Sequence, residues 1–203
     1  MALASQAGVT HLEPMNASDS TLVGKLLIAM PEMSDPRFAS TVIYMCAHSE
    51  EGGMGLIVNK PQPDVKFAKL LEQMEIPASQ AARDVPVHFG GPVDHQRGFV
   101  LHSNDYASEI GTLDVDENYC MTATLQVLED LARGEGPLKS MMALGYAGWG
   151  PGQLEYEIVQ NGWLTCAPDD AILFGADNQG KWAAALKLLG VDPLLLSATA
   201  GRA

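Results

Sequence analysis

Three apolar runs near the start of the chain have the length and pattern of β-strands. The run LVGKLLIAM covers residues 22–30 and is stopped by Pro31. Two further runs, TVIYMCAHS at 41–49 and MGLIVNK at 54–60, are separated only by EEGG. Glycine readily adopts the positive φ angles that tight strand connections need, so the second and third runs are predicted to form a β-hairpin.

The next segments alternate between helix and strand patterns. In VKFAKLLEQMEI, residues 65–76, apolar side chains recur at spacings of three and four, which is typical of an amphipathic helix. A second strand pair is predicted at 85–89 and 97–103, joined by GGPVDHQ, whose residues disfavour regular pairing. A further strand is expected in NYCMTA. The segment TLQVLEDLARG predicts a helix with Thr124 as its N-cap and Gly134 just beyond its C-terminus.

The order of these elements predicts the fold class. Strands are adjacent in pairs and helices come between the pairs, which favours a mixed α+β fold over a doubly wound parallel sheet. Residues 21–203 are expected to form a single domain, because a chain of this length can bury a substantial core. Residues 1–20 are mostly small or polar and offer little to bury, so they are predicted to form a flexible N-terminal arm.

A glycine-rich stretch, ALGYAGWGPGQLEYEI at 143–158, follows a predicted buried strand. Its continuation at 153–161 has two interpretations, a strand of alternating apolar and acidic residues or a helix. Pro151 suits the first turn of a helix and Gly162 suits the position just after its end, so the helix is favoured.

The glycines around Trp149 could cradle a ligand or could only turn the chain. Their spacing matches neither dinucleotide nor phosphate loops, no Lys or Arg is near, and Glu155 would repel an anion. We therefore predict a structural role, with the indole packed over glycines that allow a turn and a close approach. A surface for a neutral ligand or a protein partner is the alternative.

The charge balance disfavours nucleic acids and membranes as direct partners. The chain has 12 Lys and Arg against 25 Asp and Glu, a formal net charge of −13, and its few cations do not cluster. The first twenty residues lack the basic and apolar regions of a signal peptide, and the longest apolar runs are too short to span a bilayer. Cys46, Cys120 and Cys166 are dispersed in apolar segments, which indicates buried thiols and a cytoplasmic location.

Candidate catalytic and metal-binding residues are few. Cys46 and His48 share a face of a predicted strand, but Cα atoms about 6.5–7 Å apart do not assure a thiol–imidazole hydrogen bond. His88, His95 and His102 recur every seven residues, a spacing that aligns side chains on a helix and not on the predicted strand, loop and strand. No metal-binding motif supports these histidines, so neither a metal nor a cofactor is expected.

Several blocks together resemble the AlgH/YqgE family of small bacterial proteins, from about Leu22 to the C-terminus. They are GKLLIAMPEMSDPRFASTVIYMCAHSEEGGMGLIVNKP (24–61), VHFGGPV (87–93), GFVLHS (98–103), and ALGYAGWGPGQLEYEI followed by Trp163 and Leu164. The resemblance implies an α+β domain with a largely antiparallel, partly barrel-like sheet flanked by helices. It also implies a cytosolic protein of uncharacterised molecular function, often labelled a transcriptional regulator. One departure is Arg202, where His is common in such proteins.

Two classes of function remain open. The first is a non-enzymatic regulatory or binding protein that acts through an unknown protein partner or a small ligand. The sequence does not predict its oligomeric state. Its candidate surfaces are the hairpin tip, the Gly90 and Gly91 loop, and the turn of Gly148, Trp149 and Gly150.

The alternative is an enzyme whose polar residues converge only in the folded chain. His48, Asn59 and His102 come from predicted strand ends and are the candidates for such a site. Convergence of the three in one pocket would favour the enzyme, whereas scattered positions and an exposed apolar patch would favour a partner-binding protein.

Overall fold

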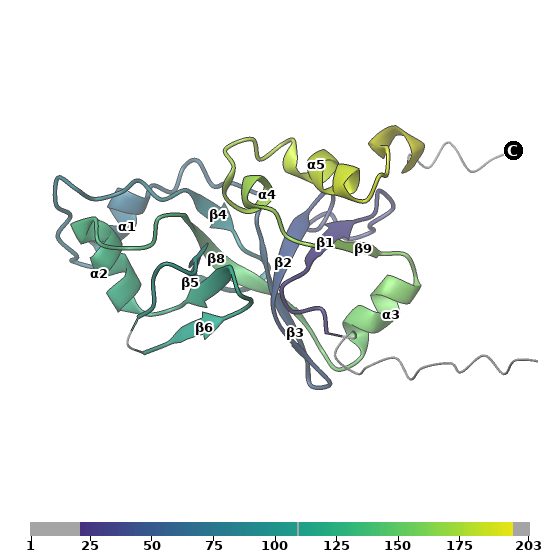
Figure 1. The fold of residues 1–203 in the computed structure, drawn as a ribbon, viewed down its shortest axis with the longest axis horizontal. Coiled ribbons are helices and arrows are strands. Elements are labelled where there is room, and N and C mark those ends of the chain that lie inside the picture. Colours follow the sequence, from purple (N-terminus) through teal and green to yellow (C-terminus); the bar gives the residue numbers. More distant parts are fainter. Residues whose placement is uncertain (1–20, 109, 197–203) are drawn as a thin grey trace, which may run out of the picture.

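A computed structural model of the chain describes residues 21–108 and 110–196 (Figure 1). The predicted arm at 1–20 and the departure at Arg202 lie outside the described residues. The strands are β1 (Leu26–Ala29), β2 (Val42–Ser49), β3 (Gly52–Ile57), β4 (Val87–Phe89), β5 (Val93–Ser103), β6 (Thr112–Asp114), β7 (Tyr119–Thr122), β8 (Ser140–Trp149) and β9 (Trp163–Cys166). The helices are α1 (Phe67–Gln73), α2 (Leu125–Arg133), α3 (Gln153–Val159), α4 (Asp170–Phe174), α5 (Lys181–Leu188) and a final 3-10 turn, η2 (Pro193–Leu196).

The strands form one curled sheet in the order β6-β7-β5-β8-β3-β2-β1-β9, with β4 attached to β8. All pairs are antiparallel except β4 with β8, which is parallel. Helices α1 and α2 lie at one end of the molecule and α3 lies at the other, whereas α4 and α5 lie between them along one side (Figure 1). The predicted mixed α+β fold with a largely antiparallel, partly barrel-like sheet is confirmed.

The predicted β2–β3 hairpin forms, and its glycine is required by close packing. Gly52 has a φ of 131°, and a Cβ atom built there would stand 2.3 Å from the carbonyl oxygen of Trp149 on β8. Helix α2 also forms where predicted and ends at Gly134 in the left-handed region. Its N-cap Thr124, however, makes no side-chain capping bond, and the hydroxyl is buried without a hydrogen-bond partner.

The predicted pairing of strands 85–89 and 97–103 is wrong. Both strands exist, but β4 and β5 each pair with β8, which comes from far along the chain. In addition, β5 begins at Val93, inside the predicted loop, and a bulge between Val93 and Gly98 contains Asp94 at a φ of 50°. Local sequence shows which residues prefer to be extended but not which distant strand offers them hydrogen bonds.

Helix α3 confirms the helical interpretation of the segment after the glycine-rich turn. It begins after Gly152, which has a φ of 69°, and Asn161 reverses the chain with a φ of 57°. Pro151 therefore lies just before the N-cap and not in the first turn. The short elements β6, β9 and α4 were not predicted, because three to five residues carry too little periodicity to be recognised.

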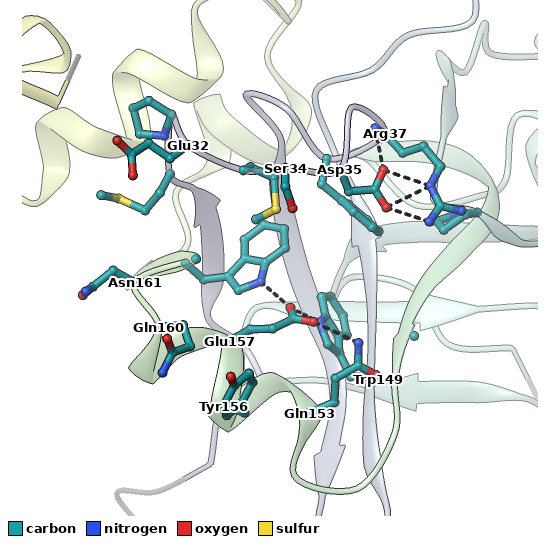
Figure 2. Close-up of a pocket in the computed structure, with 18 of the residues that line it drawn as sticks. Glu32, Ser34, Asp35, Arg37, Trp149, Gln153, Tyr156, Glu157, Gln160 and Asn161 are labelled. Atoms are coloured by element: carbon teal, nitrogen blue, oxygen red, sulfur yellow. Dashed lines mark hydrogen bonds and ion pairs between the residues drawn. The ribbon is translucent and has the colours of Figure 1, made fainter. Parts of the chain in front are cut away.

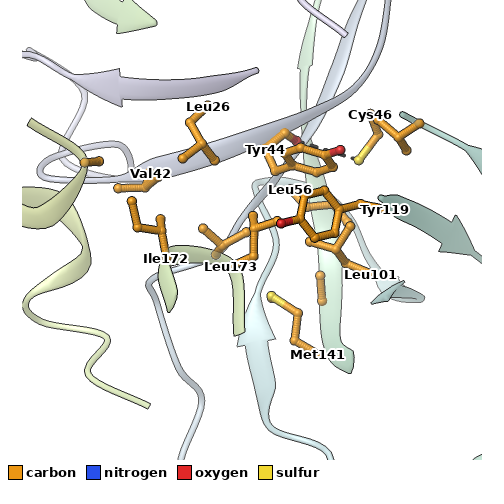
Figure 3. Packing of buried hydrophobic residues seen from close by; sticks show 14 of the residues in the cluster. Leu26, Val42, Tyr44, Cys46, Leu56, Leu101, Tyr119, Met141, Ile172 and Leu173 are labelled. Carbon is orange, nitrogen blue, oxygen red and sulfur yellow. Dashed lines mark hydrogen bonds between the residues drawn. The ribbon is translucent and has the colours of Figure 1, made fainter. Parts of the chain in front are cut away.

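Side chains alternate between the two faces of the sheet, and each face has its own apolar cluster. Leu26, Tyr44 and Leu56 point to the face that α4 and α5 cover, where they pack with Leu173 (Figure 3). Leu27, Ile43 and Ile57 point to the opposite face, with Trp149, Leu154 and Trp163. Full burial of one such aliphatic side chain stabilises a fold by about 1.5–3 kcal/mol. The second face is the one on which a groove remains.

Candidate functional site

A groove of about 1010 Å³ lies beside α3. The loop after β1, the start of β5, the end of β8, the start of β9 and one face of α3 form its walls, and η2 contributes one residue. Its surface is divided almost evenly between polar and apolar atoms, and the apolar part includes side chains of Met30, Met33, Phe38, Val93, Trp149, Tyr156, Trp163 and Leu196. A concave surface that combines apolar side chains with placed polar groups is the common form of a binding site.

The loop after β1 makes one wall because its sequence forces it to turn. Pro31 ends the strand, and the carboxylate of Asp35 accepts a hydrogen bond from the backbone N–H of Arg37 at 2.9 Å. The backbone of Phe38 also bonds back to the carbonyl of Asp35. This turn places the Phe38 ring edge-on to Trp163, with the ring centroids 5.9 Å apart.

A single carboxylate holds the two tryptophans of the groove. Oε2 of Glu157 accepts hydrogen bonds from Nε1 of Trp149 at 3.0 Å and from Nε1 of Trp163 at 2.8 Å (Figure 2). The other oxygen accepts a bond from the amide of Gln153 at 2.9 Å. The two indoles pack edge to face, with centroids 6.0 Å apart. The aromatic wall is therefore held in one orientation, because both rings share one partly buried acceptor.

The glycine-rich turn holds Gln153, which in turn bonds to the Glu157 carboxylate. Gln153 reaches back, and its side-chain oxygen accepts a hydrogen bond from the backbone N–H of Gly150 at 3.0 Å. Gly148 is exposed and lines the groove, and because it has no side chain, nothing projects from this position into the groove. The turn therefore reverses the chain and also forms part of the groove wall.

The charges of the groove are mostly acidic. Glu32, Asp35 and Glu157 line it, and Arg37 is its only cationic residue among those that the structure describes. Arg37 holds Asp35 through two nitrogens, Nε at 3.0 Å and Nη2 at 2.6 Å. This pairing lowers the pKa of Asp35 and raises the pKa of Arg37. An anionic ligand would thus meet carboxylates and a guanidinium that is already engaged.

The residues predicted as binding surfaces separate into two groups. Trp149 and Gly148 line the groove, and Gly150 lies in the adjoining turn. Gly90 and Gly91, by contrast, are buried against β8: a Cβ atom at either would stand 2.1 Å from backbone atoms of that strand. These two glycines permit backbone packing and face no groove residue.

His48, Asn59 and His102, the candidates for an enzyme site, lie apart. Nε2 of His48 contacts Oε1 of Glu155 on α3 at 2.8 Å. Asn59 lies at the other end of the β2–β3 hairpin, where its Oδ1 accepts a hydrogen bond from the Val42 N–H at 2.9 Å. Val42 and His48 are six residue steps apart along strand β2, a distance of about 20 Å.

His102 lies deeper in the sheet, between β7 and β8, and is fully buried. Its ring nitrogens contact the Ser103 carbonyl and the Thr122 hydroxyl, both at 2.9 Å. Burial lowers the pKa of this imidazole. The structure therefore does not bring the three residues into one pocket.

Sequence reasoning missed most of the groove. Gln153, Tyr156, Glu157 and Gln160 recur at spacings of three and four and line one side of α3. The helical interpretation already contained that signal, since such positions share a helix face. Glu155, which was considered as the carboxylate near the glycines, faces His48 instead. No local pattern connects Glu157 with the two indoles or with the loop after β1.

Other chemistry finds little support in the described part of the chain. No group of three or more His, Cys, Asp or Glu residues there is arranged to hold a metal ion. All three cysteines are free and buried, and burial raises the pKa of Cys46 and of Cys120 to about 12. No helix within the described ranges has the length and apolar character needed to cross a bilayer.

The curled α+β sheet flanked by helices is an AlgH-like fold. A solution structure of the AlgH protein from Pseudomonas aeruginosa superposes with a TM-score of 0.74 at 43% identity, covering 94% of this chain and all of that one. Residues 26–194 match the AlgH-like family model, and the chain belongs to that family.

Further relatives extend over the same region. A UPF0301 protein of Ruegeria pomeroyi is 60% identical over 183 residues, which are 90% of this chain and 99% of the relative. A UPF0301 protein of Paracoccus denitrificans is 55% identical, covering 91% of this chain and 98% of the relative. A crystal structure of a Corynebacterium diphtheriae protein shares the fold with a TM-score of 0.66 at 19% identity, covering 88% and 91% of the two chains.

Proposed function

We propose that this protein is a non-enzymatic regulatory protein of the cytoplasm that binds a segment of a protein partner in the groove beside α3. The observation that carries the proposal is the shared carboxylate of Glu157, which orients Trp149 and Trp163 in the wall of the groove. Rigid aromatic side chains in a recess are what anchors at protein interfaces pack against, because little side-chain entropy is lost on binding.

The charges of the groove indicate the chemistry of the partner. Because Glu32 is exposed and Arg37 is engaged by Asp35, the groove attracts cations and offers no unengaged cation among its described residues. The occupant that suits it is a peptide segment with a large apolar side chain beside Lys or Arg. Electrostatic attraction of this kind raises the association rate and excludes acidic competitors.

Direct DNA binding is not part of the proposed function. Duplex binding at physiological salt draws on counterion release by several Lys and Arg residues gathered on one surface. Here α1 carries only Lys69 in its span, and α5 carries a buried Lys181 and Lys187. We expect no salt-sensitive binding when the protein is titrated into labelled duplex at about 50 mM and 200 mM salt. Tight binding that weakens steeply with salt would contradict this expectation.

Peptide titrations test the groove directly. The probes are the capped tripeptides Lys-Phe-Lys, Glu-Phe-Glu and Lys-Ala-Lys, and the signal is the change in tryptophan fluorescence, to which Trp149 and Trp163 in the groove and Trp182 outside its lining contribute. Lys-Phe-Lys should bind at least about tenfold more tightly than either control peptide, because only it has both the apolar anchor and the complementary charge. Equal binding of the three peptides would contradict the proposal.

Two substitutions on α3 form a matched pair for this titration. Tyr156 lines the groove with 66% of its surface exposed, whereas Val159 is 74% exposed and is not part of the lining. Tyr156→Ala should weaken binding of Lys-Phe-Lys at least about tenfold, and Val159→Ala should leave it unchanged. The free energy of unfolding of both variants should lie within about 0.5 kcal/mol of the wild-type value, since both positions are on the surface. Equal effects of the two substitutions on binding would place the peptide elsewhere.

A further inference from the structure

Strand β6 is an open edge of the sheet, at the end of the molecule away from α3 (Figure 1). It pairs only with β7, and the Val115 N–H bonds to the carbonyl of Tyr119. Hydrogen bonds alternate along an antiparallel pair, so Leu113 also faces β7 while the N–H and C=O groups of Thr112 and Asp114 point outward. No described residue hydrogen bonds to these four outward groups. Unpaired groups of this kind are a template for an additional strand.

Exposed apolar side chains lie on both faces of the sheet near this edge, Leu113 on the face of Met121 and Leu101 and Leu125 on the face that α2 covers. Leu113 is 41% exposed, Ile110 just before the strand is 78% exposed, and Leu125 at the start of α2 is 55% exposed. The start of α2 lies against the segment before β6, since a Cβ atom at Gly111 would stand 2.5 Å from Cγ2 of Thr124. An incoming strand would therefore find side-chain contacts as well as backbone groups.

The chain segment that forms this edge carries only negative charges. Residues 103–120 contain no Lys or Arg, and Asp114, Asp116 and Glu117 stand in or directly after β6. The Asp114 and Glu117 side chains are exposed. Charge at an exposed edge is a device against self-association, and here it has one sign only.

We propose that β6 accepts an extended, basic segment of another protein as an additional strand. Outward backbone groups of Thr112 and Asp114 supply the hydrogen bonds, and the side chain of Leu113 contacts the apolar residues of the segment, which share the face of the sheet on which Leu101 and Met121 lie. Lys or Arg at the remaining positions meets the acidic β6–β7 hairpin. A second copy of this chain is disfavoured as the occupant, because two chains of net charge −13 would bring like-charged hairpins together.

Amide exchange distinguishes strand addition from other binding. The probe is a capped seven-residue peptide of alternating Lys and Val, added to the full-length isotope-labelled protein. The outward N–H groups of Thr112 and Asp114 should become protected from exchange at least about tenfold, whereas the N–H of Leu113, already bonded to β7, should change little. Alternating Glu and Val, or the Lys and Val peptide with N-methylated valines, should give no protection.

A proline substitution blocks the edge without breaking the sheet. Asp114→Pro removes an outward N–H, and proline is tolerated where an edge strand donates no ladder bond. This variant should lose the peptide-induced protection at Thr112, whereas Asp114→Asn should retain it with weaker binding. Leu188→Ala, a 55% exposed position on α5, is the unaffected control. If Asp114→Pro also unfolds the protein, the N-methylated peptide alone decides the question.

Several results would overturn the proposal. They are equal protection by the acidic and the basic peptide, equal protection by the N-methylated peptide, protection that maps away from β6, and no protection at millimolar peptide. Self-association of the free protein that Asp114→Pro abolishes, measured by sedimentation, would assign the edge to a second copy instead.

Discussion

The two faces of strands β1, β2, β3 and β9 show how one sheet can be closed on one side and open on the other. On the first face, α4 and α5 cover the strands, and the polar Lys181 of α5 is 3% exposed, its Nζ donating to the carbonyls of Val58 at 2.9 Å and Leu173 at 3.3 Å. On the second face, α3 and the loop after β1 leave the groove between them.

The difference lies in what the polar groups do. The buried amine on the closed face satisfies backbone groups inside the protein. The carboxylate of Glu157 on the open face instead holds two indoles at the wall of the groove. A buried polar group that is fully used internally indicates a structural role, whereas a partly buried one that fixes the aromatic wall of a groove suits a binding role.

The largest effect is expected from the open face. Trp149→Ala should lower the free energy of unfolding by about 3–5 kcal/mol, because the indole is 7% exposed and a cavity would replace it. Trp149→Phe, which keeps an aromatic ring and loses the bond to Glu157, should cost much less. Denaturant titrations of the three proteins measure both values. Unchanged stability of the Ala variant would mean that the ring serves binding alone.

The closed face should give stability a dependence on pH. Burial lowers the pKa of Lys181 to about 8, whereas the unfolded chain keeps a lysine pKa near 10.5. Between these values the unfolded state binds the proton and the folded state does not, so this residue makes stability rise with pH. The rise from about pH 7.5 to 9.5 should be about 2 kcal/mol in the wild type.

Lys181→Met should remove this rise, and Lys187→Met, exposed on the same helix, is the matched control. The difference between variant and wild type isolates Lys181 from the tyrosines, which also titrate at alkaline pH. Parallel pH profiles of wild type and Lys181→Met would show that the amine stays protonated in the folded protein.

The Glu157 carboxylate should contribute less to the free energy of unfolding than the Trp149 ring does. Glu157→Gln replaces two charge-assisted hydrogen bonds from indoles by neutral ones, and we expect a loss of about 1–2 kcal/mol. The fluorescence spectrum of the groove tryptophans should shift in the same variant, because their acceptor has changed. Glu155→Gln on the same helix, whose partner is His48, should leave the spectrum unchanged.

The smallest effects separate two glycines of the turn. Gly152→Ala should cost about 1 kcal/mol, because its φ of 69° is unfavourable for alanine even though a Cβ atom would meet nothing within 4 Å. Gly150→Ala should change stability by less than about 0.5 kcal/mol, as it has no positive φ and a Cβ atom would meet only a side-chain oxygen at 3.9 Å. Thermal melts compare the two, and equal losses would contradict this assignment.

The sequence predictions were right where the interactions are between residues close in the chain and wrong or incomplete where the partners are distant in it. The β2–β3 hairpin, helix α2 and helix α3 were predicted because periodicity and turn residues are local signals. The pairing of β4 with β5 was wrong because β8 supplies partners to both from more than 35 residues away. Trp149 was recognised as a candidate, but its acceptor Glu157 and its neighbour Trp163 were not.

Sequence by itself determined the class of fold, the strand and helix character of the longer segments, and the acidic composition of the chain. It also contained the family resemblance that the comparisons bear out. Only the tertiary structure decided the strand order, the bonds that occupy His48, Asn59 and His102, and the meeting of α3 with the loop after β1 in a groove. The reason is physical: backbone preference is encoded residue by residue, whereas packing and hydrogen bonding join residues that are distant in the chain.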